Sequence, residues 1–320
     1  MKMLNWLIIP LVFTACGTDS DMQTQTSDGN NNGNAAHTPY VTQLEFPRIS
    51  SNGKRKVIIH EVGSKMNYAV EWDYNRKAQR WTCYTLTPES YANNGNSRRN
   101  LWPKGDPWDY DPNIDSQDQQ AISNELSKSY FPDDSDAYYE KGHICPSADR
   151  LATKEENEQT YLMTNILPMV HNFNAGVWEK METQVRKWLG NTDSREWSGF
   201  CDTLFVCKGG TISEDKILGY TVDQAKVNNE SYPHPGHHPI PRHYFMALLA
   251  KKGNTYHALG FWVEHTNQPY SKTDGLGNYV VNIRKLEQQT GLDFFCNLPD
   301  DIEEKVENVT MEEIRRFWGL

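Results

Sequence analysis

The sequence of 320 residues lacks several features that mark common protein classes. Its six cysteines form no Cys-x-x-Cys pair and match no zinc-knuckle spacing, so we expect no structural zinc site. No internal repeat is present, and no apolar run reaches the roughly 18 residues of a membrane-spanning helix. Basic residues number 32 against 42 acidic ones, which gives a formal net charge of -10. Nucleic acid would therefore have to be held by a local basic groove and a metal ion, because long-range attraction is weak.

The first residues predict a targeting segment. Residues 1–15 have a basic start and a short apolar stretch, and they read as a lipoprotein signal peptide. The segment Phe13-Thr14-Ala15-Cys16 resembles the box at which bacterial lipoproteins are cleaved and lipidated. We expect Cys16 to be the mature N-terminus and to anchor an exported protein at the cell envelope, on the periplasmic or the surface face of the outer membrane. The alternative is an ordinary secretory signal that is cut nearby.

Residues 16–37 contain almost nothing apolar, and their composition predicts a disordered tether. Residues 38–320 then form a single domain. Five cysteines besides Cys16 fall in this domain, in a compartment where disulfides persist. Since five is odd, at least one is unpaired. Cys201 and Cys207 are close enough in sequence to bridge a short loop, but the connectivity stays open.

Runs of β-branched and aromatic residues predict strands, and apolar residues spaced by three and four predict helices. The expected strands are 56–60, 67–72, 81–86, 203–208, 242–250 and 255–262, with a hairpin turn at 251–254. The expected helices are 117–129, 175–189, 281–291 and 311–318. This mixture indicates an α+β fold with a mainly antiparallel central sheet and flanking helices.

The candidate catalytic and metal-binding residues lie between Tyr138 and Arg186. A strand 138–143 ends at His143, a second strand 159–168 ends at a proline, and the helix 175–189 follows. Asn174 falls at the helix N-cap, and Glu182 and Arg186 lie one turn apart on the same helix. The buried stripe of the helix is expected to consist of Val177, Met181, Val185 and Trp188.

Hydrolysis of a phosphodiester needs a base to deprotonate water, a cation to offset charge on the phosphate, and donors that hold neighbouring phosphates. A neutral imidazole suits the base. An amide oxygen and a carboxylate are hard oxygen ligands for Mg²⁺, with Mn²⁺ or Ca²⁺ as alternatives. His143, Asn174, Glu182 and Arg186 supply these types of group.

These residues resemble the DNA/RNA non-specific endonucleases of the ββα-metal (His-Me finger) class, which includes mitochondrial endonuclease G. That family has Asp-Arg-Gly-His, then Pro and Ala, then Ser/Thr-Asn and Pro, then Asn, Gly, Trp and Glu. The matching residues here are Glu140-Lys141-Gly142-His143, Pro146, Ala148, Thr164-Asn165, Pro168, Asn174, Gly176, Trp178 and Glu182. The tail from Ile283 to Pro299 also looks like the closing segment of the family, so the resemblance covers nearly the whole domain.

The resemblance implies that His143 is the general base and that Asn174 is the direct metal ligand. Glu182 would contact the metal through water, and Arg186 would hold the phosphate or the leaving group. Lys141 stands where the family has arginine, so it keeps the charge but loses the bidentate fork. The family's early arginine falls at Thr85 here, and Arg98 or Arg99 is a candidate substitute.

Three hypotheses follow. The first is an exported, metal-dependent endonuclease that cuts DNA, RNA or both. The second is a catalytically weak or inactive lipoprotein that binds nucleic acid at the surface, and the third is a phosphodiesterase for small nucleotides. Each residue also has a purely structural interpretation, in which Asn174 is only a helix cap and Glu182 and Arg186 are only an exposed surface pair. The histidines of the proline-rich stretch 233–243 are not expected to bind metal.

Overall fold

The computed structural model describes residues 29–35, 40–50, 52–90, 94–119, 139–190, 199–221, 238–271 and 274–320. The strands are β1 (Arg55–Val62), β2 (Lys65–Asp73), β3 (Ala78–Leu86), β4 (Tyr139–His143), β5 (Ile166–Val170), β6 (Thr203–Gly210), β7 (Ile217–Tyr220), β8 (Pro239–Pro241), β9 (His243–Lys252), β10 (Thr255–Glu264) and β11 (Val280–Val281). The α-helices are α1 (Arg98–Leu101), α2 (Lys154–Gln159), α3 (Glu179–Trp188), α5 (Ile283–Thr290), α6 (Asp300–Glu307) and α7 (Met311–Trp318). A π-helical turn, Phe173–Trp178, precedes α3.

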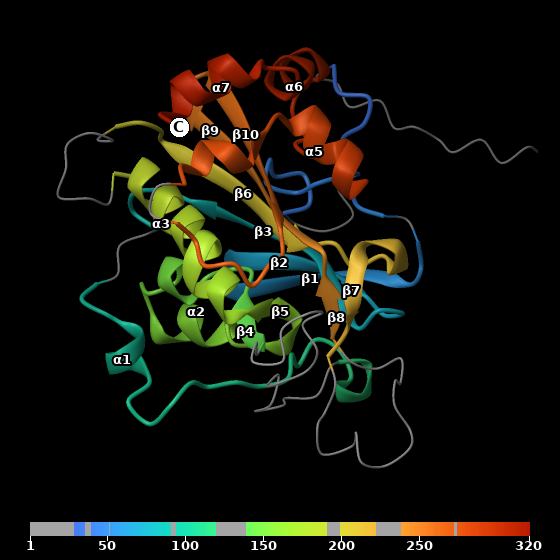
Figure 1. Cartoon of the computed structure of the whole chain (residues 1–320), viewed down its shortest axis with the longest axis vertical. Coiled ribbons are helices and arrows are strands. Elements are labelled where there is room, and N and C mark those ends of the chain that lie inside the picture. The colour runs from blue at the N-terminus through green and yellow to red at the C-terminus, as the bar shows by residue number, and fades with distance from the viewer. Residues whose placement is uncertain are drawn as a thin grey trace, which may run out of the picture.

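In the described part of the chain, seven antiparallel strands form the central sheet, in the order β1-β2-β3-β6-β9-β10-β11 (Figure 1). Two small antiparallel pairs, β4-β5 and β7-β8, stand beside it. All six strands predicted for this sheet are present. The β9–β10 hairpin also turns where expected, with Gly253 at φ +55°, a conformation that glycine adopts without strain. The predicted α+β architecture is therefore confirmed.

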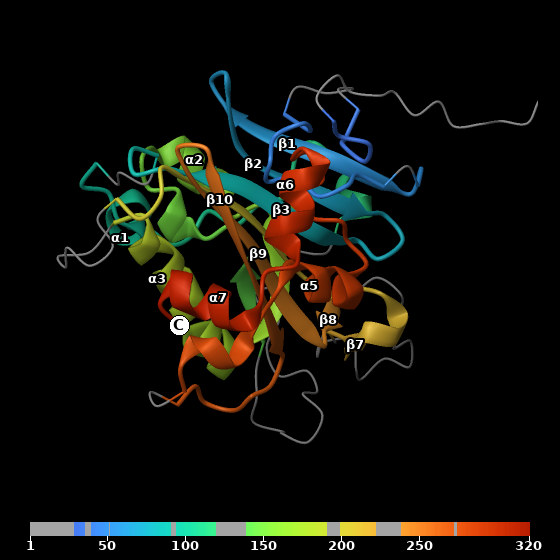
Figure 2. The same ribbon diagram turned by 90° about the horizontal axis from the view of Figure 1, so that it is seen from above.

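The sheet separates two hydrophobic cores, because the strands bury side chains on both faces. One core joins the sheet to β4, β5, α3 and α7, where Trp188 and Trp318 pack with ring centroids 4.6 Å apart. The other joins the sheet to α5, α6 and the N-terminal segment. Seen from above, α5 and α6 lie across one face of the sheet (Figure 2). The unit that carries His143 belongs to the first core.

Two of the predicted elements differ in part from the structure. The segment 159–168 is predicted as one strand. Its first residue, Gln159, is the last residue of α2, and a 3-10 turn at Met163–Asn165 follows before β5 begins at Ile166. Asn165 explains the turn, because its side chain donates to the carbonyls of Cys145 and Thr160 and accepts from the backbone N–H of Cys145. These bonds compete with strand pairing. Of the predicted helix 117–129, the described part is a short 3-10 turn, and residues 120–129 lie outside the described residues.

The end of the predicted tether is packed against the domain. Asn30 Nδ2 donates to the carbonyls of Cys296 and Leu298 at 2.7 and 2.6 Å, and the buried Asn34 bonds Val41 and Pro47. The polar composition predicted disorder, but asparagine side chains satisfy backbone groups that would otherwise be buried without partners. Residues 29–35 therefore belong with the domain. The predicted signal peptide and Cys16 lie outside the described residues.

The five described cysteines are all free and buried. Cys201 and Cys207 are not bridged, because they belong to different cores: Cys207 faces Cys83 across β3 and β6, and Cys201 packs near Trp188. None of the helices in the described part of the chain has the length and apolar character to span a bilayer.

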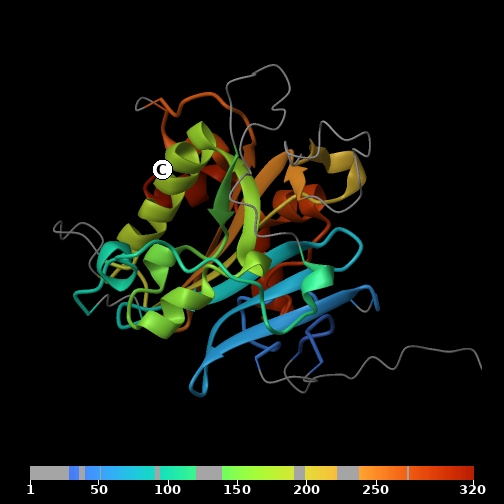
Figure 3. The same cartoon turned by 90° about the horizontal axis from the view of Figure 1, so that it is seen from below.

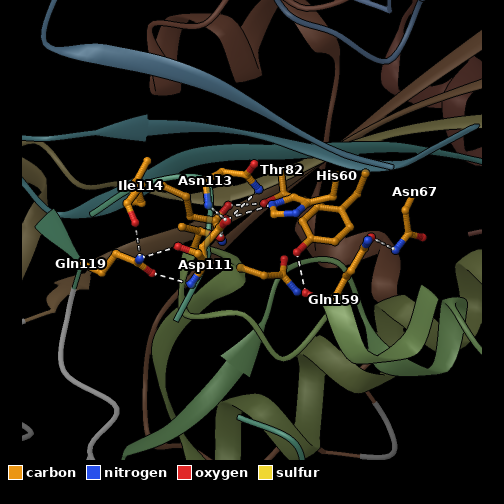
Figure 4. Close-up of polar contacts among 12 residues, drawn as sticks. His60, Asn67, Thr82, Asp111, Asn113, Ile114, Gln119 and Gln159 are labelled. Carbon is orange, nitrogen blue, oxygen red and sulfur yellow. Dashed lines mark hydrogen bonds and ion pairs between the residues drawn. The ribbon is translucent and has the colours of Figure 1, made fainter. Parts of the chain in front are cut away.

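A buried polar network pins the loop that follows α1. Asp111 lies between His60, Asn113 and Gln119 (Figure 4), with its Oδ2 3.1 Å from His60 Nε2 and accepting from Thr164 at 2.5 Å. Although burial opposes it, contacts with His60 and Thr164 lower the pKa of Asp111 to about 2. These contacts tie the loop to β1 and to the turn before β5. Trp108, three residues before Asp111, packs against the His143 ring.

Candidate active site

The unit around His143 runs strand, strand, helix, as predicted. β4 pairs with β5, and the turn Phe173–Trp178 leads into α3. The turn touches β4 at two points, since Asn174 bonds Glu140 and Trp178 Nε1 donates to the His143 carbonyl at 3.4 Å. The predicted buried stripe of Val177, Met181, Val185 and Trp188 is confirmed.

Asn174 does not cap a helix. It lies inside the π-helical turn, which bends at Gly176 (φ -106°, ψ -109°), and its Nδ2 donates to Glu140 Oε2 at 2.7 Å. The other Glu140 oxygen lies 2.7 Å from His171 Nδ1. Among the described residues no donor contacts Asn174 Oδ1. A carboxamide oxygen and a carboxylate thus stand side by side, and such hard oxygen donors fit a Mg²⁺ ion.

The His143 ring is partly exposed and lies among aromatic rings. Its centroid is 5.1 Å from that of Trp108 and 4.9 Å from that of Tyr161. The Nε2 atom is buried and has no partner among the described residues. Burial, with the charges of Arg98 and Lys208, lowers the pKa of His143 to about 3, although Asp106 opposes this. The imidazole is therefore neutral at ordinary pH.

Cations line the aromatic residues beside His143, which we call the aromatic strip: Trp102, Trp108 and Tyr161. Lys141 Nζ lies 4.9 Å from the Trp108 ring, Lys154 Nζ lies 4.6 Å from the Trp102 ring, and the Arg98 guanidinium lies 5.7 Å from the Tyr161 ring. The view from below shows that the teal segment with α1 lies beside the green unit of α2, β4 and β5 (Figure 3). Positive charge thus gathers here in a chain whose overall charge is negative.

Glu182 and Arg186 do not form the surface pair of the structural interpretation. Glu182 Oε1 accepts from Lys208 Nζ at 2.7 Å, and Arg186 Nη1 donates to Asp149 Oδ1 at 3.0 Å. Lys208 is 1% exposed and also lies 4.6 Å from the Trp178 ring. Burial raises the pKa of Glu182, although Lys208 and Arg186 oppose it.

The faces of β3 show where the position of the family's early arginine lies. Tyr84 and Leu86 belong to the core on the His143 side, whereas Cys83 belongs to the opposite core. Because side chains alternate along a strand, Thr85 points away from His143. Arg98 instead lies close enough to His143 to affect its pKa, and it is paired with Asp106. Arg99 is exposed.

Several residues of this site are not obvious in the sequence. The partners Lys208 and Asp149 lie far from α3 along the chain, and the aromatic strip comes from two separate segments. One signal was available: Lys208 directly follows the apolar run Leu204–Cys207 in a predicted strand, where a charge is buried only if it is paired.

The described residues contain one group of three carboxylates that could hold a metal ion, Glu287, Asp293 and Glu307, whose oxygens lie within 4.8 Å of one another. It belongs to the α5–α6 region and not to the His143 site. Of the four histidines in and after the proline-rich stretch, His234 and His237 lie outside the described residues. His238 is buried and His243 stacks on Trp262 at 4.4 Å.

A mixed α+β domain with a neutral imidazole among cationic side chains and a pair of hard oxygen donors has the parts of a hydrolase for phosphate-bearing substrates. The comparison with protein families agrees: residues 48–301 match the DNA/RNA non-specific endonuclease family. The chain belongs to this family.

Individual nucleases are also similar. The nuclease of Syncephalastrum racemosum is 28% identical over 180 residues, covering 54% of this chain and 52% of that protein. Nuclease C1 of Cunninghamella echinulata var. echinulata is 25% identical over 236 residues, covering 72% and 81%. The match thus spans about half the length of the first relative and most of the second. A solved structure of an EndoG/EndoGI complex has the same fold, with a TM-score of 0.56 at 18% identity, covering 82% of this chain and 94% of that one.

Proposed function

We propose that the protein is a metal-dependent endonuclease that hydrolyses phosphodiester bonds in DNA, RNA or both, with His143 as the general base. The observation that carries the proposal is the neutral His143 imidazole on the same strand as Glu140, the residue that bonds Asn174. A nuclease needs both groups at one phosphate.

The residues divide the chemistry among them. Nδ1 of His143 is the nitrogen that water can reach, since Nε2 is buried, and it takes a proton from the attacking water. The water oxygen bonds to phosphorus, the bond from phosphorus to one ester oxygen breaks, and that oxygen takes a proton from a solvent water molecule. The cations of Lys141 and Arg98 hold the phosphate and its neighbours.

Asn174 Oδ1 would hold the divalent cation, with Glu140 beside it, and Mg²⁺ is the ion that this donor set suits best; Mn²⁺ and Ca²⁺ are alternatives. When bound, the ion offsets negative charge on the phosphate and the leaving oxygen. Glu182 would have two roles: it would contact the ion through water, and its carboxylate pairs with the buried Lys208 ammonium, which lies against the Trp178 ring. Arg186 is held by Asp149, which also accepts from Tyr84 at 3.0 Å, so the Arg186 side chain is oriented before substrate arrives.

The aromatic strip suits the substrate that the family name indicates. Bases have flat faces that stack on tryptophan and tyrosine rings, and their phosphates would be met by the adjacent Lys141, Lys154 and Arg98. Neither interaction reads base identity, which supports action without sequence preference.

The decisive experiment is plasmid nicking by the purified protein across Mg²⁺, Mn²⁺ and Ca²⁺, with EDTA as the metal-free condition. His143→Ala and Asn174→Ala should each lose at least about a hundredfold in rate with an unchanged circular dichroism spectrum. His257→Ala is the matched control, since His257 stacks on Phe317 in α7 and takes no part in the site. Binding of plasmid without cleavage under every metal would instead favour the non-catalytic surface protein, and cleavage of small chromogenic diesters alone would favour a small-molecule phosphodiesterase.

We also propose that the protein is exported and lipid-anchored through Cys16 at the cell envelope. The support is the leader sequence alone. Mass spectrometry of the membrane fraction tests it, and a mature N-terminus other than a lipid-modified Cys16 would refute it.

A further inference from the structure

A cavity of about 510 Å³ opens on the face of the sheet opposite His143. It lies between the turn after β2, the end of β6 and the end of α5. Phe245 and Leu292 in its wall belong to the second core, which the sheet separates from the His143 unit. Lys216, which also lines the cavity, ends the turn that leads into β7, the strand labelled on the right of Figure 1. The proposed nuclease chemistry does not use this cavity.

The wall of the cavity is strongly cationic. Four basic side chains line it, against a single carboxylate, Asp73. The four are Arg55, Arg76, Arg80 and Lys216. In a chain with a formal net charge of -10, such a gathering around one hollow marks a place suited to an anion.

Two of these cations pair with well-buried carboxylates, and two do not. Arg55 pairs with Asp73 at 3.1 Å, and Arg80 pairs with the buried Glu71. Arg76 donates to the Tyr220 hydroxyl at 2.7 Å and pairs with Glu214, whose side chain is 66% exposed. Such a surface pair is readily exchanged for another anion. Lys216 Nζ contacts a neutral carbonyl, that of Gln289, at 2.8 Å, and no carboxylate among the described residues.

The rest of the wall is mixed: Asn75, Thr211, Ser213 and Thr290 are polar, and three residues are apolar. Phe245, Leu292 and Ile212 line the cavity and are all nearly buried. A bare anion would leave this surface unused, whereas a ligand with an anionic end and a flat or apolar body would cover it. A guanidinium group can donate two parallel hydrogen bonds to phosphate oxygens. The four cations come from separate segments that line the same cavity, so they can contact different oxygens of one anion.

We infer that this cavity binds a small organic phosphate of about the size of a mononucleotide, with the phosphate on Arg76 and Lys216 and the body against Phe245 and Leu292. The cavity volume lies within the range of roughly 300–1,000 Å³ that is usual for small-molecule sites. The ligand could come from nucleic acid breakdown or from a sugar phosphate, and the probes below distinguish these sources.

Titration calorimetry in EDTA tests the inference, because without divalent metal the site at Asn174 does not contribute. The probes are adenosine 5′-monophosphate, ribose 5-phosphate, inorganic phosphate and adenosine. Adenosine 5′-monophosphate should bind best, about tenfold more tightly than inorganic phosphate, because the base covers the apolar wall. Adenosine alone should bind weakly. If ribose 5-phosphate bound as tightly as adenosine 5′-monophosphate, the site would be confirmed and its ligand would be a sugar phosphate.

Variants of the cavity residues, with matched controls, test whether the probe binds in this cavity. Arg76→Ala and Lys216→Ala should each weaken it by about tenfold, the effect of one lost charge-assisted hydrogen bond. Lys54→Ala removes an exposed cation outside the cavity and should change nothing. Lys216→Ala should also leave plasmid cleavage unchanged, since the cavity is on the far face. The inference fails if no phosphate probe binds, if inorganic phosphate binds as tightly as the nucleotide, or if Lys141→Ala, and neither cavity variant, abolishes binding.

Discussion

Nδ2 of Asn174 donates to Oε2 of Glu140 at 2.7 Å, which fixes the orientation of the carboxamide. With the nitrogen committed to Glu140, the oxygen is the atom left to face a cation. Glu140 also contacts His171, so its carboxylate is itself held on both sides. The residue three positions before the proposed base therefore positions the proposed metal ligand, and groups that orient metal ligands affect metal affinity strongly.

This relationship predicts the effect of changing Glu140. Glu140→Ala should raise the Mg²⁺ concentration for half-maximal cleavage by roughly 10–100-fold, because Asn174 is no longer aligned. Glu140→Gln keeps an acceptor oxygen, so its Mg²⁺ concentration for half-maximal cleavage should lie between those of Glu140→Ala and the native protein. Cleavage rates measured over a Mg²⁺ titration give the answer.

The control for Glu140 is Glu158→Ala, which removes an exposed carboxylate from α2. It should leave the Mg²⁺ dependence unchanged. If Glu140→Ala lowered the maximal rate without moving the Mg²⁺ midpoint, the positioning role would be wrong.

The second prediction concerns pH. Burial, Arg98 and Lys208 disfavour the imidazolium of His143, and Asp106 favours it. Arg98→Gln removes a cation and also leaves Asp106 without its partner, so the pKa of His143 should rise. The acidic limb of the profile of kcat/KM against pH should then move to higher pH. Arg99→Gln, the neighbouring exposed arginine, should leave the limb in place, and an equal shift in both variants would contradict the assignment.

The third prediction concerns stability. Burial raises the pKa of Glu303 to about 7 and that of Glu45 to about 7, and it also raises the pKa of Glu287 and Glu307, which face each other beside Arg284. A folded-state pKa above the unfolded value of 4.5 means that the native protein binds more protons. This contribution to stability is complete below about pH 4.5 and is lost as the pH rises through 7.

The melting temperature should accordingly rise as the pH is lowered from 8.5 to about 6. Glu307→Gln should flatten this dependence, because the amide is neutral throughout. Glu312→Gln, which alters an exposed carboxylate in the first turn of α7, should not. A melting temperature that rose with pH over this window would show that the acidic groups are better solvated than their burial indicates.

The fourth prediction concerns the thiols. The five described cysteines are free and buried, and burial raises the pKa of each, to about 12 for Cys145 and Cys201. In the native protein they should react negligibly with a thiol reagent at pH 8, and all five should react after denaturation without reductant. Ser64→Cys, at an exposed turn, provides a reactive reference. Fewer reactive thiols after denaturation would reveal a disulfide, with the facing pair Cys83 and Cys207 the first to examine.

The sequence predicted those features that local pattern controls. Alternation identified the strands of the sheet, and the three–four spacing identified the buried face of α3. It did not predict that Asn174 would sit inside a π-helical turn, because the bond to Glu140 joins residues 34 positions apart. The pairing of Glu182 with Lys208 and of Arg186 with Asp149 also depends on packing between distant elements. The face on which Thr85 lies also could not be predicted, because it depends on which core each side of β3 contacts.

The last prediction tests the departure at Lys141, where the family has arginine. Lys141 lies against the Trp108 ring and near Asp106, and burial lowers its pKa although Asp106 opposes this. A guanidinium at this position keeps the contact with the ring and adds a second hydrogen bond to a phosphate. Lys141→Arg should therefore raise kcat/KM on plasmid on the order of tenfold, and Lys141→Met should lower it. Lys180→Arg, an exposed exchange at the start of α3, is the matched control. If arginine gave no gain while methionine gave a loss, Lys141 would act as a point charge, and the weaker phosphate geometry expected of lysine would not limit this enzyme.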